Sequence, residues 1–187
     1  MFNINDIKNG VTFLYEGQIY QVVDFLHVKP GKGPAFVRTK LKSVTNGKVV
    51  DNTFSAGHKI DEVKVITRKF QYLYEDDNGF HFMNNDDFSQ IYLDKEMIEN
   101  SQFMKAGEEV TIILKEADEV PLSAEIPPTV YLEVVEADPG VKGNTATNAL
   151  KNAIVETGAR VMVPLFIEPG DKIKVNTEDG SYLERVK

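Results

Sequence analysis

Residues 70–83 read Phe-Gln-Tyr-Leu-Tyr-Glu-Asp-Asp-Asn-Gly-Phe-His-Phe-Met, and this stretch decides the fold class. Aromatic side chains recur at every second position in its first half, so one face of a strand is expected to hold Phe70, Tyr72 and Tyr74. A second aromatic run follows after an Asn78-Gly79 step, which is typical of a tight hairpin turn. The stretch therefore predicts two antiparallel strands joined by a short turn.

The same period-two alternation returns along the rest of the chain. It predicts further strands at Ile19–Leu26, Ala35–Val44, Lys48–Phe54, Val110–Leu114, Val130–Val135 and Lys172–Val175. Short strands with a turn signal about every ten residues are typical of barrels and sandwiches. Only short helices are expected, around Asp94–Phe103 and Asp6–Asn9. The fold class predicted from these patterns is all-β.

The charge is distributed unevenly over the 187 residues, which carry a net charge of −8. Residues 1–64 hold 9 Lys/Arg and 6 Asp/Glu, residues 65–127 hold 5 and 14, and residues 128–187 hold 7 and 9. The change of sign near residue 64 and the Pro127-Pro128 pair suggest boundaries between three units, because consecutive prolines cannot continue a strand ladder. The total charge argues against a nucleic-acid binder, but the basic first unit leaves that function open.

Composition limits the cellular setting and the chemistry. There is no cysteine, which excludes disulfides and thiolate chemistry and fits a cytoplasmic protein. No apolar run approaches the length of a membrane span, and the first residues lack the basic and apolar segments of a signal peptide. We therefore expect no membrane association.

Signatures of catalysis are missing from the sequence. The histidines His27, His58 and His81 are scattered and form no metal-binding or catalytic motif. Acidic pairs at Asp76-Asp77 and Asp86-Asp87 lack the spacing of a calcium loop, so solvated turns are the better interpretation. We expect no catalytic residue, no metal and no cofactor.

One loop stands out between two predicted strands, with the sequence Lys29-Pro-Gly-Lys-Gly-Pro34. The prolines end the ladder on each side, and the glycines remove side chains next to Lys32. The result is a protruding hairpin with a single lysine at its tip, suited to contact phosphate or a polar RNA groove. The alternative interpretation is a hairpin with an incidental solubilising lysine.

The loop and the C-terminal third together resemble the bacterial elongation factor P family. The Lys-Pro-Gly-Lys-Gly loop is similar to the family's N-terminal loop, and the spaced pattern from Lys151 to Gly170 is similar to its C-terminal signature. The ending Tyr182–Lys187 also resembles the family. The resemblance implies an SH3-like (KOW-like) barrel at 1–64, a central OB-fold barrel at 65–127 and a second OB-fold barrel at 128–187, in an elongated L-shaped arrangement.

The resemblance also implies a function without enzymatic activity. Such proteins bind both subunits of the ribosome between the P and E sites, contact rRNA and the P-site peptidyl-tRNA, stimulate peptide-bond formation and relieve stalling at consecutive prolines. A dedicated enzyme would modify Lys32. The loop at the tRNA acceptor end would comprise Lys29, Pro30, Gly31, Gly33 and Pro34.

The same resemblance assigns contacts to the third unit and leaves two alternatives. Contacts with the E-site codon, tRNA or ribosome would come from Gly143, Asn144, Thr145, Tyr182 and Arg185. A monomer in the cytoplasm is expected. An elongation factor P-like paralogue shares the architecture, and retention of Lys32 favours the principal factor. A general OB-fold single-stranded nucleic-acid binder is the other alternative, and the acidic middle unit argues against it.

Overall fold

The computed structural model describes residues 1–140 and 149–186 and is built from three antiparallel sheets. The chain divides into two compact units. The first comprises Met1–Lys69, Leu93–Glu99 and Thr111–Glu125, and the second comprises Phe70–Tyr92, Asn100–Val110 and Ile126–Lys187. The strands of the central sheet are divided between these units, so the boundaries at residues 64 and 127 stay a prediction. The predicted all-β class is confirmed.

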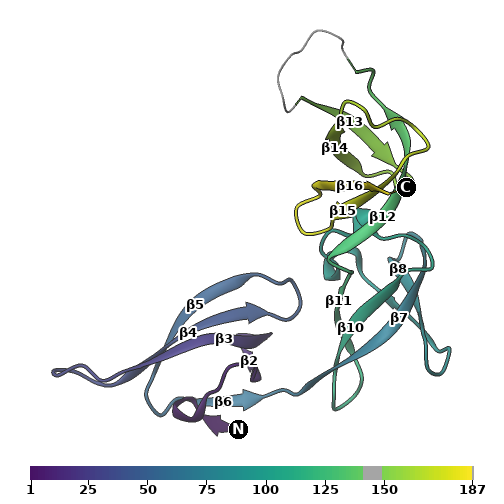
Figure 1. Cartoon of the computed structure of the whole chain (residues 1–187). Coiled ribbons are helices and arrows are strands. Elements are labelled where there is room, and N and C mark those ends of the chain that lie inside the picture. Colours follow the sequence, from purple (N-terminus) through teal and green to yellow (C-terminus); the bar gives the residue numbers. More distant parts are fainter. Residues whose placement is uncertain (141–148, 187) are drawn as a thin grey trace. The chain divides into compact units, whose positions relative to one another are not determined.

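The first sheet has six strands in the order β1-β6-β2-β3-β4-β5 (Figure 1). These are β1 (Phe2–Asn3), β2 (Thr12–Tyr15), β3 (Gln18–Val28), β4 (Phe36–Ser43), β5 (Val49–Ser55) and β6 (Lys59–Glu62). Its core is a cluster of eight buried apolar side chains that includes Phe13, Leu41 and Phe54. The Phe13 and Phe54 rings meet edge to face with centroids 6.1 Å apart, a favoured geometry for aromatic pairs.

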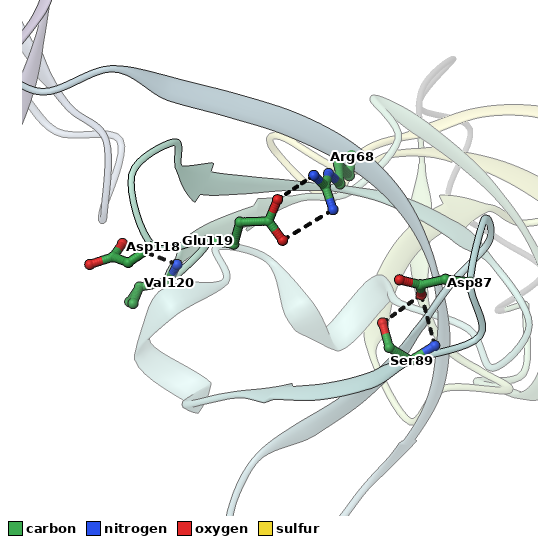
Figure 2. Close-up of polar contacts among 6 residues, drawn as sticks. All are labelled: Arg68, Asp87, Ser89, Asp118, Glu119 and Val120. Carbon is green, nitrogen blue, oxygen red and sulfur yellow. Dashed lines mark hydrogen bonds and ion pairs between the residues drawn. The ribbon is translucent and has the colours of Figure 1, made fainter.

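The central sheet has five strands in the order β11-β10-β7-β8-β9. These are β7 (Val65–Glu75), β8 (Phe80–Asn84), β9 (Gln90–Leu93), β10 (Glu109–Lys115) and β11 (Pro121–Glu125). The predicted β7–β8 hairpin is confirmed, since Gln71 pairs with Met83 and Glu75 with Phe80. At the β10–β11 turn, Figure 2 shows the guanidinium of Arg68 facing the Glu119 carboxylate through two contacts.

One prediction about this hairpin is wrong. The sequence placed Tyr74 on the same face as Phe70 and Tyr72, and those two rings are buried. However, the register shifts between Tyr72 and Tyr74, so Tyr72 lies opposite Phe82 whereas Tyr74 lies opposite His81. A β-bulge adds one residue to a strand and thereby reverses the alternation. Tyr74 is consequently turned outward and is half exposed.

The predicted helices are shorter than expected and partly displaced. Residues 94–103 form two 3-10 turns, η2 (Lys95–Met97) and η3 (Ser101–Phe103), in place of one helix. The first turn ends because Ile98 is extended, with φ −129° and ψ 109°. Asn100, with a left-handed φ of 58°, immediately precedes the second turn. Near the N-terminus the turn η1 spans Ile4–Asp6, and Ile7 is already extended where the sequence predicted a helix over 6–9. In the described residues, no helix is long and apolar enough to cross a membrane.

The third sheet has five strands in the order β14-β13-β12-β15-β16. These are β12 (Thr129–Ala137), β13 (Leu150–Val155), β14 (Arg160–Pro164), β15 (Lys172–Asn176) and β16 (Tyr182–Val186). Strand β12 pairs with β15 through its first half and with β13 through its second half. Its alternate side chains Val130, Leu132 and Val134 are therefore buried in the core.

Phe103 joins this third core from outside the sheet. It ends η3, is 4% exposed, and belongs to the buried cluster around Leu132 and Val155. Gly180, in the β15–β16 turn, lies directly against its ring, because a Cβ placed on Gly180 would come within 2.9 Å of Phe103 Cζ. Only glycine accommodates both this approach and the φ of +70° at that position.

We therefore expect Gly180→Ala to lower the free energy of unfolding by about 2–4 kcal/mol, through left-handed strain and displacement of Phe103. The matched control is Gly158→Ala, where φ is +85° but no atom lies within 4 Å of the added Cβ. That control should cost only about 1–2 kcal/mol, from backbone strain alone. Urea unfolding of both variants measures the difference, and equal losses would show that the contact with Phe103 contributes nothing.

Candidate functional site

The hairpin of β3 and β4 carries the candidate site at its tip, at the end of the extended purple and blue hairpin in Figure 1. The last cross-strand pair is Val28 with Phe36, and β5 supports β4 up to the same level by pairing Ser55 with Phe36. Seven residues, 29–35, lie beyond these pairs. At about 3.3 Å per residue they can extend roughly 10 Å from the sheet and return.

The predicted loop residues all lie together at this tip. Each residue from Lys29 to Pro34 is exposed. Gly33 has a φ of +109°, which side-chain-bearing residues rarely adopt, and a Cβ at this position would lie 3.9 Å from the Pro30 ring. A Cβ on Gly31 would meet no atom within 4 Å. Lys32 therefore lies between two glycines, which place no side chain beside it. Pro30 and Pro34 stiffen the backbone on either side.

Strand β4 supplies a basic row behind the tip that the sequence interpretation missed. Its burial alternates strictly, with Val37, Thr39, Leu41 and Ser43 facing inward. The outward positions are Arg38, Lys40 and Lys42. Residues 18–43 together carry five Lys/Arg and only one Asp/Glu. Charges at every second position of a predicted strand were the signal that could have revealed this row.

The cations of this row have different neighbours. Lys40 lies between Asp24 on β3 and Asp51 on β5 in the strand register. Arg38 instead lies between Leu26 and Thr53, and its guanidinium carbon is 5.5 Å from the centroid of the Phe36 ring. A cation over an aromatic face is attracted to it and loses rotamer freedom. Arg38 is thus held in place by an aromatic ring, and no carboxylate lies beside it in the strand register. It is also the cation of the row that lies closest to the loop.

The predicted contacts in the third sheet are only partly described. Gly143, Asn144 and Thr145 lie outside the described residues. Tyr182 is partly buried and packs against the third core. Arg185 lies over the Phe166 ring at 5.4 Å, with Nη1 3.8 Å from Asp171 Oδ2, so its guanidinium is held at the surface.

One carboxylate of each acidic pair, Asp76 and Asp87, caps a turn. Asp76 Oδ1 accepts hydrogen bonds from the backbone N–H groups of Asn78 and Gly79, at 2.8 and 3.2 Å. Asp87 Oδ1 accepts from the N–H and hydroxyl of Ser89, at 2.9 and 2.6 Å (Figure 2). Within residues 1–140 and 149–186, no three His, Asp or Glu side chains form a group that could hold a metal ion. The interpretation of these pairs as turns agrees with this geometry.

Three family models match consecutive parts of the chain. They are an elongation factor P KOW-like domain over residues 3–60, an elongation factor P OB domain over 65–123, and an elongation factor P C-terminal domain over 130–185. An elongation factor P of Flavobacterium psychrophilum is 57% identical over 187 residues, and one of Christiangramia forsetii is 58% identical over 187 residues. Each alignment covers 100% of both proteins.

A solved structure is similar in fold alone. A translation initiation factor eif-5a family protein from Naegleria fowleri is 14% identical, with a TM-score of 0.50, and the match covers 67% of this chain and 96% of that one. The family models and the bacterial relatives place the chain among the translation factors. It belongs to the elongation factor P family.

Proposed function

We propose that the chain binds the ribosome between the P and E sites and positions the end of the P-site peptidyl-tRNA, so that peptide bonds form faster at consecutive prolines. The observation that carries this proposal is the exposed, glycine-flanked Lys32 at the tip of a basic hairpin. Membership in the elongation factor P family supports it. The site of action would be the cytoplasm, where translation occurs, and the factor would act as a monomer.

The mechanism we propose is orientation rather than acid–base chemistry. Proline is a stiff donor and a poor nucleophile, so a misplaced peptidyl-tRNA end lowers the reaction rate. Holding reacting groups in a productive geometry recovers rate without any proton transfer by the factor. Lys32 would steady the acceptor end of the tRNA, with Lys29, Pro30, Gly31, Gly33 and Pro34 shaping the loop around it. The factor is therefore not an enzyme in this scheme.

The rest of the protein would supply binding energy and register. The proposed domains are residues 1–64, which present the loop, 65–127 and 128–187. In the last of these, Gly143, Asn144, Thr145, Tyr182 and Arg185 would meet the E-site codon, tRNA or ribosome. Binding energy from such remote contacts can hold the reactive tip in place. A lysine-directed enzyme would extend Lys32, since its amine is accessible and its glycine neighbours leave room for a catalytic pocket.

Co-sedimentation with ribosomes tests the binding step. Ribosomes that carry a P-site peptidyl-tRNA and an empty E site should retain the protein, whereas ribosomes with an occupied E site should retain much less of it. Equal retention on both would contradict a site between P and E. Equal affinity for any single-stranded RNA would instead favour a general OB-fold nucleic-acid binder.

Arg38 should contribute more to ribosome binding than Lys40. We expect Arg38→Ala to weaken binding and to lower the slope of log affinity against log salt by about 0.7–0.9, the loss of one phosphate contact. The matched control Lys40→Ala should change the slope less, because Asp24 and Asp51 lie in register on either side of it. The test is co-sedimentation at several salt concentrations. A slope lowered equally by both variants would refute the distinction.

A further inference from the structure

Two exposed tyrosine rings and the partly buried His81 ring between them form a strip on the outer face of the central sheet. The Tyr74 and His81 rings stack with centroids 4.5 Å apart and planes 16° from parallel, and Tyr92 lies beyond His81 with centroids 6.3 Å apart. The rings come from three neighbouring strands, β7, β8 and β9. Tyr74 is 51% exposed and Tyr92 is 59% exposed.

The strip does not serve the core. The buried aromatic cluster uses the opposite side chains of β7 and β8, with the Tyr72 ring 5.6 Å from Phe82 and 6.0 Å from Phe80. Tyr74 faces outward only because of the bulge that follows Tyr72. Bulges commonly re-aim one side chain at a binding surface. Large rings that remain exposed next to one another on a folded protein are a mark of an interaction surface.

The surroundings of the strip are acidic. Residues 70–92 contain five Asp/Glu and no Lys or Arg. One of these carboxylates touches the strip, since Asp76 Oδ2 lies 2.9 Å from His81 Nε2. Hydrogen bonding from the Asn78 N–H, and then from His81 and the Gly79 N–H, lowers the pKa of Asp76 below its usual value despite some burial. Asp76 therefore stays negative at neutral pH.

We propose that Tyr74, His81 and Tyr92 form a docking surface for arginine side chains of a basic segment of another protein. A guanidinium is planar, so it can stack on the tyrosine faces while its N–H groups reach a carboxylate such as Asp76. The chain already uses this chemistry elsewhere, where the Arg185 guanidinium lies over the Phe166 ring with its Nη1 3.8 Å from Asp171 Oδ2. RNA is disfavoured as the binding partner because its phosphates would be repelled by residues 70–92, which carry acidic side chains and no Lys or Arg.

This proposal is independent of the Lys32 loop and can be tested on the isolated full-length protein. The probes are a capped Gly-Arg-Gly-Arg-Gly peptide, its Gly-Lys-Gly-Lys-Gly counterpart and a short oligouridylate, each titrated into isotope-labelled protein and followed by NMR. We expect the arginine peptide to shift the ring resonances of Tyr74, His81 and Tyr92. Its affinity should exceed that of the lysine peptide by about threefold or more, because only the planar guanidinium stacks.

Variants locate the binding. Tyr74→Ala and Tyr92→Ala should each weaken the arginine peptide by about threefold or more, and both should fold because the two rings are exposed. Tyr131→Ala is the matched control, since Tyr131 is 49% exposed on a different sheet. Three results would overturn the proposal. These are no shifts at millimolar peptide, equal affinities for the two peptides, and stronger shifts of these rings by the oligouridylate.

Discussion

Lys32→Ala is expected to remove almost all rescue of a triple-proline reporter in cells that lack the native factor, a loss of about tenfold or more if the loop orients the tRNA end. The same change should alter the free energy of unfolding by less than about 0.5 kcal/mol, because Lys32 is exposed between two glycines. Reporter output and urea unfolding of the purified variant measure the two effects. Full rescue by a normally folded Lys32→Ala protein would remove the basis of the proposed function.

Two companion variants separate position, charge and modification. Lys29→Ala removes another exposed lysine from the same loop and should reduce rescue only modestly, through one lost charge. Lys32→Arg keeps the charge, but a guanidinium cannot accept a group that an enzyme attaches to the lysine amine. It should therefore fail as severely as Lys32→Ala if the modification is required. Rescue by Lys32→Arg would mean that a positive charge at the tip is sufficient.

Phe103→Ala is expected to cause the largest loss of stability, about 3–5 kcal/mol, since it would leave a cavity in a close-packed core. Phe103 is buried among side chains of the third sheet although it lies before β10 in the chain. The matched control is Phe88→Ala, because Phe88 is 69% exposed. That change should shift the free energy of unfolding by less than about 0.5 kcal/mol. Urea unfolding followed by circular dichroism measures both.

A small effect of Phe103→Ala, comparable to that of Phe88→Ala, would contradict the packing described for the third core. The same packing predicts what happens when the C-terminal residues are removed. Removing residues 128–187 would deprive Phe103 of the apolar partners around it, and Lys105 of the Glu156 carboxylate that lies 2.8 Å from its Nζ. A shortened chain should therefore expose an aromatic side chain that the full chain buries.

The strands and the candidate loop could be predicted from the sequence because both rest on local signals. Alternation along residues 36–43 predicts a half-buried strand. A protruding turn is marked, from the local sequence alone, by Pro30, Gly31, Gly33 and Pro34. The resemblance to the family added the role proposed for Lys32, which the loop by itself left open between a functional tip and an incidental lysine.

Other features depend on contacts that the local pattern does not contain. The bulge that turns Tyr74 outward is set by pairing with β8, whereas simple alternation placed that ring on one face with Phe70 and Tyr72. Ile98 is extended and Asn100 is left-handed between two 3-10 turns, where the sequence suggested one helix. The burial of Phe103 depends on residues of the third sheet, from Val130 onward, and local propensity cannot reveal contacts at that sequence separation.

The most direct test of the central claim is the single-turnover rate of peptide-bond formation in purified translation. The reaction joins a peptidyl-tRNA that ends in proline to an incoming prolyl-tRNA. It is run with a saturating concentration of either the protein purified from its own cells or the Lys32→Ala variant. The account predicts acceleration by the first protein and a rate close to the factor-free value with the variant, while both are retained on the ribosome. Equal acceleration by the two proteins would contradict the claim that the tip of this hairpin positions the tRNA.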